Sequence, residues 1–415
     1  MVQASIITIG DELLIGQVID TNSAWMAQQL NTAGIRVARR VAVGDVWDEI
    51  WNTLDEESKH ADIILITGGL GPTADDITKP LLCKYFGGKL IVDKGALANV
   101  EYIFKNVLNR PMIESNLKQA EVPDVCKVIL NKRGTAPGMW FEKEGKIFVS
   151  MPGVPHEMKG MMEDEVIASL KARFTLPHIA YRTLLTAGIG ESYLAELIKD
   201  FETVLPENIR LAYLPNYGMV RLRLSTSGID KNIVEKDVEH QFDILQKLVK
   251  EYLVTNEDEA IEAVVGKLLK AKGRTVSTAE SCTGGYIAHL FTSMPGSSAF
   301  FDGSVVSYSN KVKEALLYVG HDTLEDHGAV SEEVAKQMIQ GALQTIKTDY
   351  AIAVSGIMGP DGGTTEKPVG TVWIAVGNAE KTITKKLHFR FDRIRNIQLT
   401  AVNALNMLRQ FILEN

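Results

Sequence analysis

The stretch that decides the fold is Thr278-Ala279-Glu280-Ser281-Cys282-Thr283-Gly284-Gly285, in which a small hydroxyl lies where a strand gives way to a helix. Residues 274–279 predict a short buried strand, and apolar residues follow at Ile287, Leu290 and Phe291 with helical spacing. We therefore expect Ser281 at a helix N-terminus. Free amides there either take a serine as their cap or stabilise an oxyanion formed when the serine attacks a carbonyl.

A second strand-to-helix junction lies in residues 300–313, where Ser309 or Asn310 can cap the predicted helix. Lys313 then falls in the first helical turn, where the helix dipole disfavours a cation. Burial would lower its pKa further, and a neutral lysine can take a proton from a serine. The alternative interpretation is a solvated surface lysine.

Residues 258–415 carry several motifs in a fixed order: TAESCTGG, PGSS (295–298), YSN (308–310) with a lysine three residues on, GAVS (328–331), SGIMGPDGG (355–363) and KPVG (367–370). Together they resemble the CinA C-terminal domain, the nicotinamide mononucleotide amidohydrolase family. The resemblance implies that Ser281 is the nucleophile, Lys313 its base and Tyr308 a hydroxyl that positions or relays the proton. It also implies contacts to substrate from Ser298, Ser355, Arg395, Gly284 and Gly363. This domain is expected to need no cofactor.

Two features of this half leave alternatives open. Cys282 is a rival nucleophile because a helix N-terminus lowers a thiol pKa, and it ranks below Ser281 because the family motif places the reaction on the serine. The arginines of residues 390–395 resemble a solvated charged face. Arginine also binds phosphate through a planar fork, and the amides of residues 359–363 could join the same anion site.

The N-terminal half alternates predicted strands with predicted helices at residues 22–32 and 47–60, which indicates parallel β-α-β packing. One strand runs into a loop holding Asp11 and Glu12, and a strand at residues 62–67 enters a glycine-rich loop. Ligands bind at the carboxyl ends of such strands.

Glycines let backbone amides approach a phosphate, and neighbouring carboxylates suggest a divalent cation, although paired aspartates are often helix caps. The motifs GDELL, DTN, TGGLGPTADDIT, NKRGTAPG (131–138) and MPGVPHEM (151–158) resemble the N-terminal CinA domain, a relative of molybdopterin-binding proteins, over residues 1–170. The resemblance implies a metal-dependent ADP-ribose pyrophosphatase. Its nucleotide site would comprise Asp11, Glu12, Asn22, Gly68, Gly69 and Gly71, and its divalent metal would lie at Asp75 and Asp76.

Residues 175–254 predict a small α+β module that could resemble a nucleic-acid-binding KH fold but lacks the GXXG loop, so we interpret it as a spacer or dimerisation domain. The expected fold class is α/β: a parallel-sheet molybdopterin-binding-like domain, this module, and an α/β amidohydrolase domain at 258–415. A net charge of −8 argues against broad nucleic-acid binding.

Three cysteines without paired spacing, no apolar run that spans a membrane and no signal segment predict a cytoplasmic protein. We expect it to be a homodimer acting on two small nucleotides, nicotinamide mononucleotide and ADP-ribose. The rival hypothesis is a non-catalytic nucleotide- or molybdopterin-binding protein linked to competence or DNA damage.

Overall fold

The computed structural model of the protein describes residues 2–73 and 76–415. The chain divides into two compact units, one formed by Met1–Ala180 with Ser227–Glu235 and the other by Tyr181–Thr226 with Lys236–Asn415. Among the described residues, no helix combines the length and apolar character needed to cross a bilayer.

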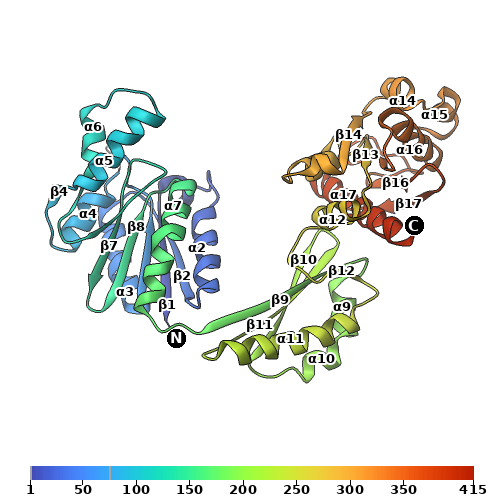
Figure 1. The fold of residues 1–415 in the computed structure, drawn as a ribbon. Helices are drawn as coiled ribbons and strands as arrows, with labels where there is room; N and C mark the ends of the chain where they lie inside the picture. The colour runs from blue at the N-terminus through green and yellow to red at the C-terminus, as the bar shows by residue number, and fades with distance from the viewer. Residues whose placement is uncertain (1, 74–75) are drawn as a thin grey trace. The chain divides into compact units, whose positions relative to one another are not determined.

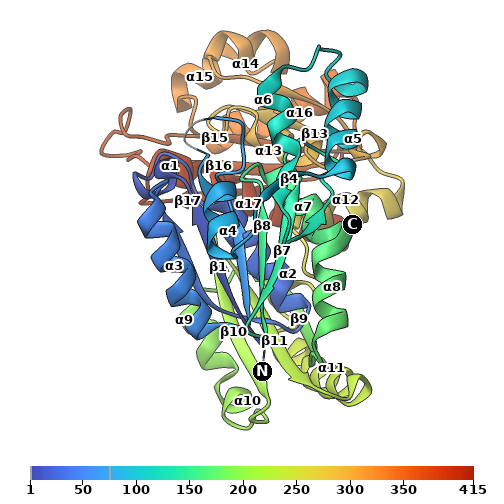
Figure 2. The same cartoon turned by 90° about the vertical axis from the view of Figure 1, so that its left-hand side faces the viewer.

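The N-terminal domain is a six-stranded sheet with helices on both faces (Figures 1 and 2). Its elements are β1 (Gln3–Ile9), α1 (Asp11–Leu14), α2 (Thr21–Thr32), β2 (Arg36–Val43), α3 (Trp47–His60), β3 (Ile63–Thr67), α4 (Thr78–Tyr85), β4 (Leu90–Val92), α5 (Lys94–Tyr102), η1 (Ile103–Val107), α6 (Glu114–Leu117), η2 (Lys118–Ala120), β5 (Glu121–Pro123), β6 (Lys127–Ile129), β7 (Gly138–Lys143), β8 (Lys146–Met151), α7 (Pro155–Met161), η3 (Met162–Val166) and α8 (Ile167–Arg173).

The strand order is β2-β1-β3-β8-β7-β6, in which the first four strands are parallel and β7 and β6 are antiparallel additions. Apolar side chains of α2, α7 and α8 fill one face of the sheet, and those of α3 and α4 fill the other. The parallel order brings the carboxyl ends of β1, β2, β3 and β8 to one edge, as the sequence pattern predicts.

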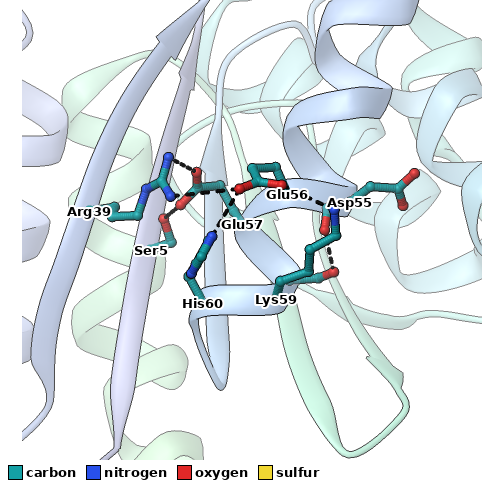
Figure 3. A network of polar contacts seen from close by, with 8 residues as sticks. Ser5, Arg39, Asp55, Glu56, Glu57, Lys59 and His60 are labelled. Atoms are coloured by element: carbon teal, nitrogen blue, oxygen red, sulfur yellow. Dashed lines mark hydrogen bonds and ion pairs between the residues drawn. The ribbon is translucent and has the colours of Figure 1, made fainter.

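A buried carboxylate fastens α3 to this sheet (Figure 3). Glu57 is 1% exposed, accepts a hydrogen bond from the Ser5 hydroxyl of β1 and lies 3.1 Å from the Arg39 guanidinium of β2. Such a charge is tolerated in a core only when it is paired and hydrogen-bonded. The neighbouring Glu56 instead binds Lys59 and His60 of its own helix in solvent, where ion pairs contribute little stability.

The middle segment is a four-stranded sheet of order β10-β11-β9-β12 with three helices. Its elements are β9 (His178–Ala187), α9 (Glu191–Leu197), α10 (Lys199–Thr203), β10 (Ile209–Asn216), β11 (Met219–Gly228), α11 (Lys231–Leu248) and β12 (Leu253–Thr255). Helices α9 and α10 are two short helices and not one continuous helix, because Ile198 between them leaves the helical conformation.

The C-terminal domain has a five-stranded sheet of order β14-β13-β15-β16-β17 between two helical layers. Its elements are α12 (Ile261–Lys272), β13 (Val276–Glu280), α13 (Tyr286–Thr292), η4 (Ser297–Ala299), β14 (Phe301–Val306), α14 (Asn310–Leu317), α15 (His321–His327), α16 (Glu332–Ile346), β15 (Tyr350–Gly356), β16 (Thr371–Gly377), β17 (Thr382–His388) and α17 (Arg393–Glu414).

Strands β14, β13 and β15 are parallel, so the loops after them meet at one edge of the sheet. Helices α12, α13 and α17 pack on one face against valines and isoleucines of the strands. Helices α14, α15 and α16 pack on the other, where the strands present alanines that let the helices approach closely. The edge at the ends of β13, β14 and β15 carries the TAESCTGG, YSN and SGIMGPDGG motifs.

Candidate active site

Ser281 and Lys313 come together at this edge. Ser281 follows β13 and is 9% exposed, and its amide donates to the Val354 carbonyl of the neighbouring β15. Lys313 is the fourth residue of α14, whose cap is the Ser309 hydroxyl. The Lys313 Nζ lies 3.0 Å from Ser281 Oγ and donates to the Ser307 carbonyl at 2.7 Å. The pairing predicted from two separate motifs is therefore present in the fold.

The environment of Lys313 favours its neutral form. Its side chain is 1% exposed, and this burial lowers its pKa below the ordinary 10.5 of a lysine. The solvated-lysine alternative is wrong. A neutral amine that donates one hydrogen to Ser307 keeps its lone pair for the proton of Ser281, as a general base requires.

Cys282 cannot compete with Ser281 as a thiolate. Its side chain is buried, and the loss of hydration raises its thiol pKa to about 12. A thiol reacts as a nucleophile only after it loses its proton, so the raised pKa disfavours Cys282 as a nucleophile at neutral pH. This supports the ranking of the serine above the cysteine.

The helix N-terminus expected at Ser281 lies elsewhere. Helix α13 begins at Tyr286, and its first amides, of Ile287 and Ala288, bind the carboxylate of Glu280. Ser281 instead lies in a tight turn in which Gly284, with a φ of 61°, donates its amide to the Ser281 carbonyl. The prediction was wrong because sequence spacing does not reveal that a buried glutamate takes these amides first.

A cavity of about 270 Å³ opens beside the pair. Tyr308 and Ser355 line it, as predicted. Tyr308 is 63% exposed, and its hydroxyl accepts from Arg393 at 2.9 Å. The Ser355 hydroxyl donates to the Ala329 carbonyl at 2.6 Å, which fastens the GAVS loop to β15.

The arginine that lines the cavity is Arg393, whereas the family resemblance pointed to Arg395. Its guanidinium donates to the Gly359 carbonyl at 2.7 Å and to Tyr308. Arg395, the expected arginine, is absent from the described lining residues and lies with its guanidinium 4.0 Å from the centre of the Phe391 ring. Both arginines lie in the first turn of α17, whose N-cap is Asp392.

Three further predicted residues lie outside the described lining of the cavity: Gly284, Gly363 and Ser298. Ser298 is exposed on η4, which precedes β14, whereas the YSN motif follows that strand. Six residues of β14 therefore separate it from the Ser281 edge, about 20 Å of extended chain. Gly363 packs against the backbone of Val369, where a Cβ would lie 2.7 Å from the Val369 nitrogen.

The N-terminal glycine loop follows β3 at the carboxyl edge. Gly68 and Gly69 have φ values of 117° and 63°, and a Cβ on either would lie within 2.2 Å of a neighbouring oxygen, so only glycine fits. Asn22 donates to the Gly153 carbonyl at 2.7 Å, and Gly153 packs on Gly68. Asn22 and Gly68, two of the predicted nucleotide-site residues, therefore both contact Gly153 in the loop after β8.

The predicted acidic residues of this edge hold loops together. Asp11 and Asp45 exchange amide-to-carboxylate bonds of 3.3 Å, and the Glu12 carboxylate lies against Gly10. Asp76 accepts from the amides of Gly71 at 2.8 Å and Thr73 at 2.9 Å, so it caps the glycine loop.

Asp75, the other predicted metal ligand, lies outside the described residues. Among the residues that are described, no group of three or more histidine, cysteine, aspartate or glutamate side chains could hold a metal ion. Because the Asp76 carboxylate is already bonded to two amides, the described residues do not fit a divalent cation.

Three family comparisons cover most of the chain. Residues 258–412 match the CinA C-terminal domain, residues 5–172 a probable molybdopterin binding domain, and residues 181–255 the damage-inducible protein CinA KH domain. The last match corrects the interpretation that a missing GXXG loop argues against a KH fold. Ile198 alone separates α9 from α10, so there is no room for a four-residue loop between these two helices.

Relatives extend over the whole chain. A CinA-like protein of Cytophaga hutchinsonii is 46% identical over 413 residues, covering 100% of this chain and 99% of its own length. A CinA-like protein of Flavobacterium psychrophilum is 44% identical over 414 residues, with 100% and 99% covered. The crystal structure of the competence damage-inducible protein A of Klebsiella pneumoniae matches with 39% identity and a TM-score of 0.36, covering 36% of this chain and 93% of that one. The chain belongs to the CinA family.

Proposed function

We propose that the C-terminal domain hydrolyses the carboxamide of nicotinamide mononucleotide to the acid and ammonia. The observation that carries the proposal is the 3.0 Å approach of a buried, desolvated lysine to the hydroxyl of a serine at a cavity. A serine beside a base that is itself held in place has the arrangement of an activated nucleophile.

The reaction follows from this pair. Lys313 takes the proton of Ser281 as Oγ attacks the carboxamide carbon, and the resulting ammonium returns the proton to the leaving nitrogen. Ammonia departs and leaves an ester on Ser281. Lys313 then takes a proton from water as the water attacks this ester, and the acid leaves while Ser281 recovers its proton.

The cavity suits a small anionic substrate. Its volume of about 270 Å³ lies just below the range of roughly 300–1,000 Å³ that is usual for ligand pockets. Arg393 makes two hydrogen bonds to protein groups and has five donor hydrogens, so further donors remain for a phosphate. We therefore propose that Arg393, in place of Arg395, meets the phosphate of the nucleotide.

Ammonia release from nicotinamide mononucleotide by the full chain tests this proposal. Nicotinamide riboside, which lacks the phosphate, serves as the matched substrate. We expect ammonia and the acid in equal amounts from the mononucleotide, and a kcat/KM lower by about 10²-fold for the riboside, because a charge-assisted phosphate contact of roughly 3 kcal/mol is lost. Tight binding of the mononucleotide with no ammonia would contradict the amidase and favour the binding-protein hypothesis.

A second proposal concerns the N-terminal domain, where the glycine loop after β3 lies at the edge formed by the carboxyl ends of the parallel strands. We propose a phosphate-containing nucleotide as the ligand of this loop, with ADP-ribose cleaved to AMP and ribose 5-phosphate. A divalent cation, if bound, would neutralise the phosphates; the described residues do not assemble its ligands, so no step is assigned to it.

The test separates metal binding from loop support. ADP-ribose cleavage is measured with and without Mg²⁺ or Mn²⁺, and metal binding is measured calorimetrically without nucleotide, in the wild type and in Asp76→Asn. Because Asp76 caps the glycine loop, we expect Asp76→Asn to disturb that loop and so to lose ADP-ribose cleavage. Ammonia release by the C-terminal domain should stay intact. Cleavage unaffected by Asp76→Asn would contradict the assignment to this loop.

A further inference from the structure

Glu280, the residue before Ser281, carries a buried carboxylate for which the proposed reaction has no use. Its side chain is 0% exposed, and it ends β13. Five hydrogen-bond donors surround it: the hydroxyls of Thr278 (3.1 Å) and Thr283 (2.7 Å) and the amides of Gly285 (3.1 Å), Ile287 (3.1 Å) and Ala288 (2.8 Å).

All five donors are neutral groups. A buried carboxylate normally needs a cation or several hydrogen bonds to offset its lost hydration, and here the bonds and the positive end of α13 serve that purpose. The carboxylate therefore ties the first turn of α13 back onto β13. Residues 281–284, which lie between the two tied ends, form the turn that presents Ser281.

The backbone of Glu280 also reaches the base. Its carbonyl accepts from the Ser307 amide at 2.7 Å, and the Ser307 carbonyl accepts from Lys313 Nζ at 2.7 Å. One residue thus connects the turn of the nucleophile, through its side chain, with the anchor of the base, through its main chain.

We infer that Glu280 is a positioning residue of the amidase: its carboxylate holds the Ser281 turn so that Oγ lies within reach of Lys313 Nζ. This inference rests on the proposed function of the C-terminal domain. The carboxylate acts through the turn and touches neither substrate nor the reacting atoms.

The variant Glu280→Gln tests the inference, because glutamine keeps the size of the side chain but offers one acceptor oxygen and turns an N–H₂ group toward the amide donors. We expect kcat for ammonia release to fall about 10–100-fold, as small misplacements of reacting groups do, with KM changed by less than about 3-fold. Hydrogen exchange of residues 285–288 should become faster. Glu57→Gln is the matched control, because it also removes the charge of a buried, hydrogen-bonded glutamate but lies in the other domain.

A second measurement keeps the inference separate from the choice of substrate. A fluorophosphonate probe labels an activated serine without any amide, so its rate on Ser281 is compared between the wild type and Glu280→Gln. If the wild type is labelled but releases no ammonia, the proposed substrate is wrong, and slower labelling of the variant still supports the positioning role. In Glu280→Gln, faster exchange at residues 285–288 with unchanged labelling and unchanged kcat would overturn the positioning role. An equal loss of kcat in Glu57→Gln would overturn it as well.

Discussion

Replacing Lys313 by methionine removes the proposed base and keeps a side chain of similar length in the same buried space. Lys313 Nζ is the nitrogen placed 3.0 Å from Ser281 Oγ, so the whole general-base contribution should be lost. Such a contribution is typically about 10²–10⁴-fold in rate, which is roughly 3–5 kcal/mol of transition-state stabilisation. We therefore expect kcat to fall by that factor with little change in KM.

Lys313→Arg distinguishes proton transfer from charge. Arginine cannot lose its proton in a protein, so it should be as inactive as methionine if the side chain acts as a base. Retained activity in Lys313→Arg would refute the reasoning, because the side chain would then supply charge alone.

The pH dependence gives a further measure of the same group. Burial lowers the pKa of Lys313, so the wild-type rate should rise with pH through a value below 10.5. Between this lowered pKa and 10.5 the unfolded lysine binds more protons than the folded one, so the free energy of unfolding should also rise with pH across that window. Lys313→Met should lose both dependences.

Thermal unfolding checks that these variants are folded. Methionine forfeits the hydrogen bond to the Ser307 carbonyl, worth about 1 kcal/mol, and relieves the desolvation of the amine. Because the two effects oppose each other, we expect the free energy of unfolding to change by less than about 2 kcal/mol. A larger loss would show that the substitution also disturbs the fold, and kcat would then be compared per folded molecule.

Four other substitutions have defined outcomes. Ser281→Ala should lower ammonia release by about 10³-fold or more, whereas Cys282→Ala should keep most of it, and the reverse result in the same assay would move the nucleophile to the cysteine. Arg393→Lys should raise KM for nicotinamide mononucleotide about 10-fold or more while leaving the riboside unaffected, since an ammonium cannot reproduce the planar fork; equal KM increases for both would contradict phosphate binding. Gly341→Ala should destabilise the C-terminal domain by about 2 kcal/mol, roughly 4–8 °C in Tm, because its Cβ would lie 2.0 Å from the Leu317 carbonyl; an unchanged Tm in calorimetry would show that α14 and α16 separate easily.

The sequence alone predicted the alternating strands and helices of the N-terminal half and, through its resemblance to the CinA C-terminal domain, the pairing of Ser281 with Lys313. Helix α3 was predicted with its observed bounds, because strong amphipathic spacing over fourteen residues leaves little ambiguity. The pairing of Ser281 with Lys313 was predicted from the resemblance of their motifs to the CinA C-terminal domain. The structure brings the two residues together because each follows a strand of one parallel sheet, and such strands end at a common edge.

Only the tertiary structure decided which neighbouring side chain faces the cavity. Arg393 and Arg395 are two residues apart at the start of α17, about 200° around a helix of 3.6 residues per turn, so one reaches the site and the other turns to Phe391. Sequence composition cannot choose between them, because the orientation of the helix is set by its packing.

The same holds for the carboxylates. Glu280 and Asp76 are both acidic residues beside glycine-containing loops. Glu280 is buried among five donors, whereas Asp76 is only partly buried and caps its own loop. Which amides a carboxylate reaches depends on how a loop folds back on its strand, and that path is determined by contacts distant in sequence.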